Sequence, residues 1–429
     1  MNKVAKNASW IIACRIAQSA FALVINMLTA RFLGPSNFGL ITYAASLVTF
    51  VVPIMNLGLN NILVQEVVNN PEREGQTVGT SICLSLCSSV CCIIGVSAFA
   101  YIANRESPIT IIVCLLYSIN LIFQALELIR YWFQAKYLSK YTSLVSLGAY
   151  LVVSAYKIYL LATGKNVCWF AISNAFDYAL ISIALIVIFH KIGKQRLSFS
   201  WELGKKLFSR SKHYILSTMM VTIFAQTDKI MIKHMIDESS TGYYGAAVAT
   251  AGLTSFVFSA IIDSFRPFIF EGNKKNEQVF EHRLTLLYSI VIYISLVQSV
   301  FMTLLARYII LALYGSAYAP AGSALQIVVW YTTFSYIGSV RNIWILVHNK
   351  QHYLWLINMS GALANVAINI ALIPVIGING AAIASLTTQF FTNVIVGYII
   401  KDIRPNNAIM VRSLNPKLLI EATRKLIKK

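Results

Sequence analysis

The sequence predicts an all-α polytopic membrane protein, with about twelve transmembrane helices in two six-helix lobes around a central cavity. Of its 429 residues, 57% are hydrophobic and only 12% are charged, and the mean hydropathy is +0.67. Runs without Asp, Glu, Lys or Arg, such as 351–400, exceed the roughly 20 apolar residues that one crossing needs. Lipid offers the backbone no hydrogen-bond partners, so such runs are expected to be helical.

Turn signals rich in Gly and Pro separate the predicted spans. The spans centre on residues 10–30, 41–60, 80–102, 109–129, 142–162, 167–189, 213–235, 244–268, 284–306, 324–346, 353–373 and 381–400. The dividing signals are Gly34-Pro35, Asn70-Pro71, Ser107-Pro108, Gly164, Gly315 to Pro320 and Pro374 to Gly380. The connections are too short to hold an extramembrane domain.

The second half of the chain repeats the plan of the first. An apolar helix leads into ARFLGPSNFGLITYAAS at 30–46, where a turn is followed by a new helix that starts with Gly, aromatic and small residues. The same order of helix, turn and new helix start occupies 213–247. Aligning Gly39 with Gly242 brings these two helix starts into register. Six spans in each half, starting in the same orientation, predict parallel repeats. The predicted parts are an N-terminal lobe at 1–189, a basic amphipathic cytoplasmic linker at 190–212, a C-terminal lobe at 213–400 and a basic cytoplasmic tail at 401–429.

The net charge of +19 comes from 35 Lys and Arg against 16 Asp and Glu. If alternate connections lie on opposite sides, 25 of the 35 bases fall on the side of both termini and five on the other. This bias places both termini in the cytoplasm. No basic domain separates from the spans, so we expect no nucleic-acid partner. A cysteine stripe at Cys83, Cys87 and Cys91 has no His or carboxylate companions and predicts packing rather than a metal site.

Polar side chains inside the spans are the candidate functional residues, because each is costly in lipid unless it faces protein or a water-filled cavity. Arg15, Ser19 and Asn26 share one face of the first helix, and several other helices carry a similar face. These faces predict a wet cavity between the lobes, although Asn and Thr stripes also fit ordinary interhelical hydrogen bonds. The candidates for substrate binding are Arg15, Arg266, Arg341, Lys229 and Asn26.

Other intramembrane charges suggest different roles. Lys157 and Asp177 lie on adjacent spans and are predicted to form a structural charge pair. Asp228 precedes Lys229 directly, so the two side chains point in different directions and each needs its own partner.

Four segments carry a resemblance to a known family. They are RFLGPSNFGLITYAAS at 31–46, TDKIMIKHMIDESSTGYYGAA at 227–247, LYGSAYAPAGSAL at 313–325 and IPVIGINGAAIAS at 373–385. In this order they resemble the multidrug/oligosaccharidyl-lipid/polysaccharide exporter superfamily, and within it the polysaccharide-biosynthesis (Wzx-type O-antigen) flippases. The resemblance covers nearly the whole chain.

The resemblance implies a function without enzymatic chemistry. It implies that an oligosaccharide on undecaprenyl pyrophosphate moves from the cytoplasmic to the periplasmic leaflet of the bacterial inner membrane by alternating access. Arg15, Arg266 and Arg341 match the role of holding the pyrophosphate, which suits a planar guanidinium. Asp228 and Asp263 are candidates for coupling to a proton or sodium gradient, with no other cofactor. Expected partners are membrane lipids, a polysaccharide polymerase and a chain-length regulator, and a monomer is the family default.

Three alternatives remain open. A lipid II flippase would have two further spans, which this sequence lacks. A cation or drug antiporter has twelve spans, but some of these place an essential acid in the first helix, where this chain has Arg15. A membrane-embedded enzyme would need a large periplasmic loop or a soluble catalytic domain, and the predicted connections offer no room for either.

Overall fold

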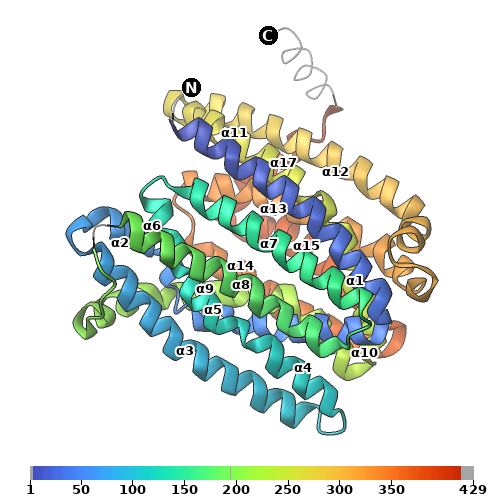
Figure 1. Ribbon diagram of the computed structural model, residues 1–429. Helices are drawn as coiled ribbons and strands as arrows, with labels where there is room; N and C mark the ends of the chain where they lie inside the picture. Colours follow the sequence, from blue (N-terminus) through green and yellow to red (C-terminus); the bar gives the residue numbers. More distant parts are fainter. Residues whose placement is uncertain (1–2, 194, 417–429) are drawn as a thin grey trace. The chain divides into compact units, whose positions relative to one another are not determined.

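The computed structural model describes the backbone of residues 3–193 and 195–416. Within these ranges the side chains of residues 3–17, 20, 274 and 275 are not described. The described residues form helices joined by short connections, with no β-strand among them (Figure 1). The chain divides into two compact units, Met1–Ile230 and Met231–Lys429.

The part of unit 1 that the structure describes is built from eight α-helices and the first part of a ninth. They are α1 (Lys3–Met55), α2 (Leu63–Asn69), α3 (Glu74–Ala103), α4 (Pro108–Ser118), α5 (Asn120–Leu126), α6 (Arg130–Ala135), α7 (Ser139–Ala162), α8 (Val167–Ile192) and α9 (Trp201–Met235). Short 3-10 helices at Leu59–Asn61, Pro71–Arg73 and Glu127–Ile129 join some of them. The unit boundary lies inside α9, so the helix continues from one unit into the other.

The described residues of unit 2 continue with eight α-helices. They are α10 (Glu238–Ala251), α11 (Ser255–Lys275), α12 (Glu277–Tyr314), α13 (Ala321–Val347), α14 (His352–Ile376), α15 (Ile378–Phe390), α16 (Val396–Ile399) and α17 (Arg404–Arg412). A π-helix, Phe391–Ile395, separates α15 from α16, and 3-10 turns occupy Gly252–Thr254, Ser316–Tyr318 and Lys401–Ile403. Such π-segments often occur at functional sites.

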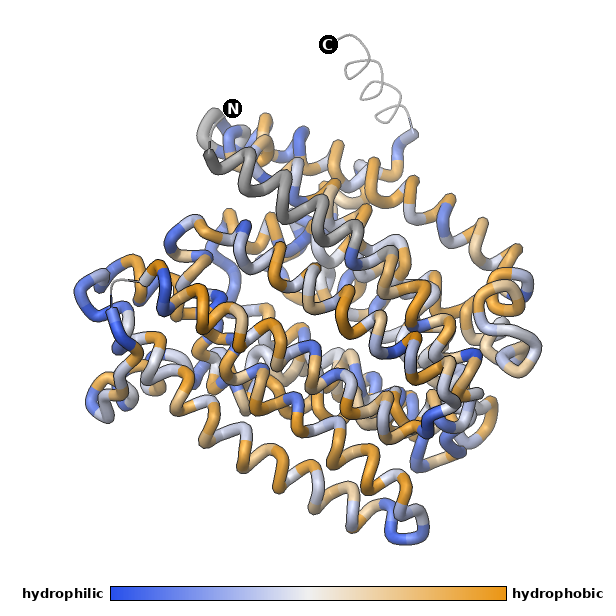
Figure 2. The backbone as a smooth tube through the Cα atoms, viewed as in Figure 1, coloured by the Kyte–Doolittle hydropathy of each residue, from blue (hydrophilic) through white to orange (hydrophobic). Residues whose placement is uncertain are grey.

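The described part of the chain contains ten helical segments that are long and apolar enough to cross a membrane. The chain is therefore an all-α, multi-pass membrane protein, as the sequence predicts. Predicted span 10–30 and most of 41–60 lie in the single long α1, which ends at Met55. Predicted span 324–346 coincides with α13, which is not among the ten. Apolar residues follow the lengths of α3 and α12, while polar residues gather at the connections (Figure 2).

The predicted turn at Gly34-Pro35 is a sharp bend in α1. Gly34 has a φ of 71° and a ψ of 172°, a conformation that a residue with a Cβ rarely adopts, and Pro35 starts the second arm with a fixed φ. The second arm carries Tyr43 and Leu47 into a core with Val113 of α4 and Phe170 of α8. Interhelical packing in a membrane depends on close van der Waals contact rather than on exclusion of water.

The connection between α8 and α9 packs along the start of α3. The Gln195 amide donates to the Pro71 carbonyl at 2.8 Å and accepts from the Gly75 N–H at 3.1 Å. A Cβ on Gly79 would lie 2.7 Å from the Ser198 nitrogen, so only glycine lets the two backbones approach this closely. The predicted linker thus has a packed segment at 195–200 and a helical segment from Trp201 onward.

In unit 2 the core gathers between α11, α12 and α13. Phe258 and Tyr336 stack with their ring centroids 3.9 Å apart, and Leu284, Val291 and Val340 are fully buried around them. The neighbouring α14 and α15 form a tight hairpin. A Cβ on Gly380 would lie 2.6 Å from the Leu372 carbonyl carbon.

Candidate functional site

The predicted substrate-binding residues divide between the two units. Asn26 and Lys229 are in unit 1, on α1 and α9, and Arg266 and Arg341 are in unit 2, on α11 and α13. Arg15 lies on α1, and its side chain is outside the described residues. The predicted cavity and its residues therefore stay a prediction. The structure gives the local surroundings of each described side chain.

In unit 1, α9 carries the predicted charges Asp228 and Lys229. Asp228 is buried, and the Lys229 ammonium donates to the Gln226 side-chain oxygen at 3.0 Å. That bond draws the ammonium back along the helix by one turn, away from the direction in which Asp228 points. Asn26, on the first arm of α1, is half-buried.

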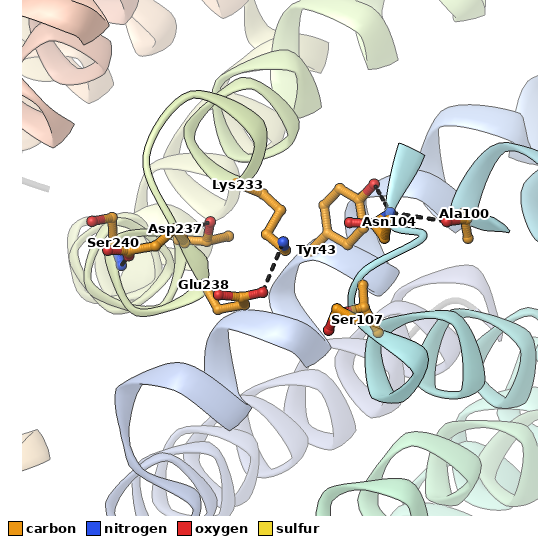
Figure 3. Close-up of polar contacts among 10 residues, drawn as sticks. Tyr43, Ala100, Asn104, Ser107, Lys233, Asp237, Glu238 and Ser240 are labelled. Atoms are coloured by element: carbon orange, nitrogen blue, oxygen red, sulfur yellow. Dashed lines mark hydrogen bonds and ion pairs between the residues drawn. The ribbon is translucent and has the colours of Figure 1, made fainter. Parts of the chain in front are cut away.

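Beyond Ile230, the end of α9 is tied to the start of α10. Lys233 forms an ion pair with Glu238 at 2.8 Å, and the Asp237 carboxylate accepts the Ser240 N–H at 2.6 Å (Figure 3). Asp237 is thereby the N-cap of α10, satisfying a backbone donor that the helix leaves open. These bonds hold the polar turn that follows Asp228 and Lys229 in the sequence.

Figure 3 also shows a separate contact inside unit 1. The Asn104 amide donates to the Tyr43 hydroxyl at 3.2 Å and to the Ala100 carbonyl at 3.1 Å. The bond joins the second arm of α1 to the turn after α3. Sequence reasoning does not single out Asn104, because a residue at a helix end ordinarily faces water.

In unit 2 the structure brings two predicted residues together on α11. Arg266 and Asp263 form an ion pair at 3.4 Å, and both side chains are exposed. This pair is one turn of helix apart, so it forms within the helix itself. An exposed guanidinium with an exposed partner remains accessible to a ligand phosphate.

Arg341 has a different environment. Its residue is only 4% exposed, and its Nη1 donates to the Thr392 carbonyl, inside the π-helix, at 2.6 Å. Its Nε has no hydrogen-bond partner among the described residues. A π-helix interrupts the regular α-helical hydrogen bonding of the backbone, and Arg341 donates a hydrogen bond to a carbonyl at this interruption. This contact gives Arg341 a structural function alongside the predicted one.

The predicted pair of Lys157 and Asp177 lies on the packed helices α7 and α8. The two charges interact electrostatically, although one Asp177 oxygen has no hydrogen-bond partner within the described part of the chain. Nearby, Glu127 forms an ion pair with Arg130 at 2.7 Å, and its charge also reaches Asp177. Unit 1 thus contains a charged group of four residues around Asp177.

Two further ion pairs, both with nearly buried carboxylates, escaped the sequence analysis. Glu74 pairs with Lys136 at 2.5 Å, and Glu66 pairs with Arg210. Each pair joins segments more than 60 positions apart in the sequence, so no local spacing indicates it.

Comparison with known proteins identifies the family. Residues 4–273 match the model of the family described as "Polysaccharide biosynthesis protein". An uncharacterized membrane protein of Methanocaldococcus jannaschii is 25% identical over 275 residues, which cover 60% of this chain and 52% of that protein. The match therefore spans about half the length of that relative.

Solved structures share the fold. A multidrug resistance MATE family transporter of the MOP superfamily, in its inward-facing conformation, superposes with a TM-score of 0.68 at 12% identity over 92% of this chain and 96% of that one. The lipid II flippase MurJ, in an inward closed conformation, gives 0.66 at 14% identity over 96% and 92%. At these identities the likeness concerns the fold, while the family match covers well over half of the sequence. The chain belongs to the polysaccharide biosynthesis protein family, and it shares the fold of these two solved structures.

Proposed function

We propose that the protein is a flippase for an undecaprenyl-pyrophosphate-linked oligosaccharide, an O-antigen or similar surface polysaccharide repeat unit. It would carry this lipid from the cytoplasmic to the periplasmic leaflet of the bacterial inner membrane by alternating access, with both termini cytoplasmic. The observation that carries the proposal is the polysaccharide biosynthesis match across residues 4–273, in a chain whose described part holds ten candidate spans. Fold likeness to a lipid II flippase supports a lipid-linked substrate.

The charges described in each unit fit an anionic head group. Arg266 is exposed on α11, and its guanidinium can contact a pyrophosphate with two parallel hydrogen bonds. Lys229 supplies a further positive charge on α9. In this proposal Asp228 and Asp263 are the candidates for proton or sodium coupling, and a polymerase and chain-length regulator would receive the product.

The test is translocation by the purified protein in vesicles. A fluorescent undecaprenyl-pyrophosphate oligosaccharide is placed in both leaflets, and its movement is followed with a membrane-impermeant quencher. Arg266→Gln is expected to slow translocation about tenfold or more, since a charge-assisted hydrogen bond contributes about 1.5–3 kcal/mol. Arg105→Gln, at the turn after α3, is the control and is expected to match the parent protein.

A cation or drug antiporter is the second candidate, favoured by the fold likeness to a MATE transporter. The same vesicles, loaded with ethidium under an imposed proton or sodium gradient, separate the two. Gradient-driven ethidium transport without lipid movement would overturn the flippase proposal.

A further inference from the structure

Unit 1 contains an apolar pocket of about 340 Å³ between α1, α3 and α9. Its size falls in the range of small-molecule sites, which are mostly apolar with a few polar groups. The lining side chains include Leu47, Phe50, Val51, Val96, Phe99 and Thr227. Among the described residues, Thr227 is the single polar side chain lining it.

The pocket is open along α3. Phe99 is four residues before the end of α3 at Ala103, about 6 Å along the helix axis. Phe99 is 44% exposed, and Gly95, one turn earlier, also lines the pocket and is exposed. A Cβ built on Gly95 would meet no atom within 4 Å. The missing side chain therefore leaves free volume on the open side of the pocket.

A positive charge lies on the same stretch of α9. Thr227 and Ile230 line the pocket, and the Lys229 ammonium is drawn back to Gln226 at 3.0 Å. The pocket-lining residues of α9 and its charged Lys229 thus fall within residues 226–230, about 6 Å along the helix axis. An anionic amphiphile fits this combination, with its phosphate toward Lys229 and its hydrocarbon chain toward α1 and α3.

We infer that this pocket binds the phosphate-proximal part of the polyisoprenyl chain of the lipid-linked substrate. This inference rests on the proposed function, which supplies an isoprenoid carrier, and it names a site for the chain rather than for the sugar. A methyl branch every fourth carbon makes an isoprenoid wider than a straight acyl chain. The unfilled position at Gly95, which lines the pocket together with Phe50 and Phe99, offers room for such branches.

The experiment fills the pocket in steps. Gly95→Ala, Gly95→Val and Gly95→Leu add increasing volume at a site without a clash, and Gly148 provides the matched control. Gly148 is an exposed glycine inside α7 whose Cβ would also meet no atom within 4 Å. Monodispersity and thermal unfolding of each variant show whether it folds, and the smaller Gly95 substitutions keep the test valid if Gly95→Leu does not.

Binding of undecaprenyl phosphate to the purified protein in detergent is measured by native mass spectrometry, with dipalmitoyl phosphatidic acid as the acyl-chain competitor. We expect affinity for undecaprenyl phosphate to fall progressively along the Gly95 series, at least tenfold for Gly95→Leu, and to be unchanged in Gly148→Leu. Equal affinity across the Gly95 series would overturn the inference. Phosphatidic acid that binds as tightly as undecaprenyl phosphate would overturn it too, by assigning the pocket to ordinary membrane lipid.

Translocation in vesicles separates this inference from the proposed function. If the parent protein moves the lipid-linked oligosaccharide and Gly95→Leu moves it at the same rate, the pocket assignment is wrong and the flippase proposal stands. If the parent protein moves none of it, the flippase proposal fails first. A rate lowered at least tenfold in Gly95→Leu, with Gly148→Leu unchanged, supports both.

Discussion

The two units hold their buried polar groups in different ways. Unit 1 uses ion pairs in which a nearly buried carboxylate meets a base that keeps partial contact with solvent. These pairs are Glu66 with Arg210, Glu74 with Lys136 and Glu127 with Arg130. Such a base can recover hydration if its partner is lost, whereas the carboxylate cannot.

Unit 2 relies mainly on neutral groups. The Tyr288 hydroxyl donates to Asn406 at 3.0 Å, and the Asn407 amide donates to the Val394 carbonyl at 2.8 Å. Arg341 and Lys233 are nearly buried charges among these groups: Arg341 bonds a backbone carbonyl, and Lys233 pairs with the partly exposed Glu238. In unit 1, removing the base of a pair should therefore cost more stability than removing its carboxylate. In unit 2, a substitution should lower stability through the hydrogen bond that it breaks.

The largest effect is expected from Lys136→Met, which leaves the Glu74 carboxylate buried without its base. Breaking a buried pair in this way costs about 3–5 kcal/mol, and we expect the lower end because Lys136 is 35% exposed. Glu74→Gln should cost clearly less, since the freed lysine can turn to water. Unfolding of the purified protein in SDS gives both values, and equal losses would contradict the proposed asymmetry.

Arg341→Lys tests the corresponding contact in unit 2. Lysine keeps the charge but lacks the planar fork that reaches the Thr392 carbonyl, so we expect a loss of about 2 kcal/mol. Arg266→Lys is the matched control on an exposed helix face and should change stability by less than about 0.5 kcal/mol. If Arg341→Lys abolishes translocation at unchanged stability, Arg341 acts on substrate rather than on the π-helix.

A smaller effect is expected at the helix caps of unit 2. Asp237→Ala removes the acceptor for the Ser240 N–H and should lower stability by about 1 kcal/mol. Asp237→Asn keeps a capping oxygen and should remain near the parent value. Thermal unfolding distinguishes the two, and a similar loss in both would assign the effect to the charge of Asp237.

The smallest effect concerns Asp402, just after α16. The Tyr353 hydroxyl donates to this carboxylate at 2.6 Å, and together with Lys350 it holds the pKa of Asp402 below its usual range. A depressed folded-state pKa stabilises the protein above the unfolded value, near pH 4, and that contribution is lost as the pH falls further. Tyr353→Phe should therefore move acid unfolding to slightly higher pH, and an unchanged midpoint would speak against the bond.

Much of the fold follows from the sequence because its signals are local. Long apolar runs predict the spans, and the Gly34-Pro35 dipeptide predicts the bend in α1, which the structure confirms. The position of α13 also follows, although its polar residues make it less apolar than its neighbours. The continuous α9 could not be predicted, because the basic composition of its first turns at 201–212 is typical of a linker outside the membrane.

The candidate site is harder to predict, because burial depends on residues distant in sequence. Arg341 and Arg266 are the same residue type in predicted spans, yet one lies against a π-helix and the other is exposed. The apolar pocket is invisible in the sequence for the same reason. Its key feature, Gly95, is an absent side chain in an apolar helix, and composition alone cannot distinguish free volume from close packing.

The bend at Gly34 also has a consequence for how the protein is made. The arms Lys3–Leu33 and Pro35–Met55 are each at least 30 Å long at 1.5 Å per residue, enough to cross the hydrocarbon layer separately. Joined by so short a turn, they would leave the translocon together as a hairpin, returning the chain to the side of the ribosome. A Cβ at Gly34 would meet no neighbouring atom, but the positive φ of this residue is unfavourable for any residue that has a side chain. Substitutions there would then reduce insertion during synthesis, and the yield of protein would fall before the finished fold is affected.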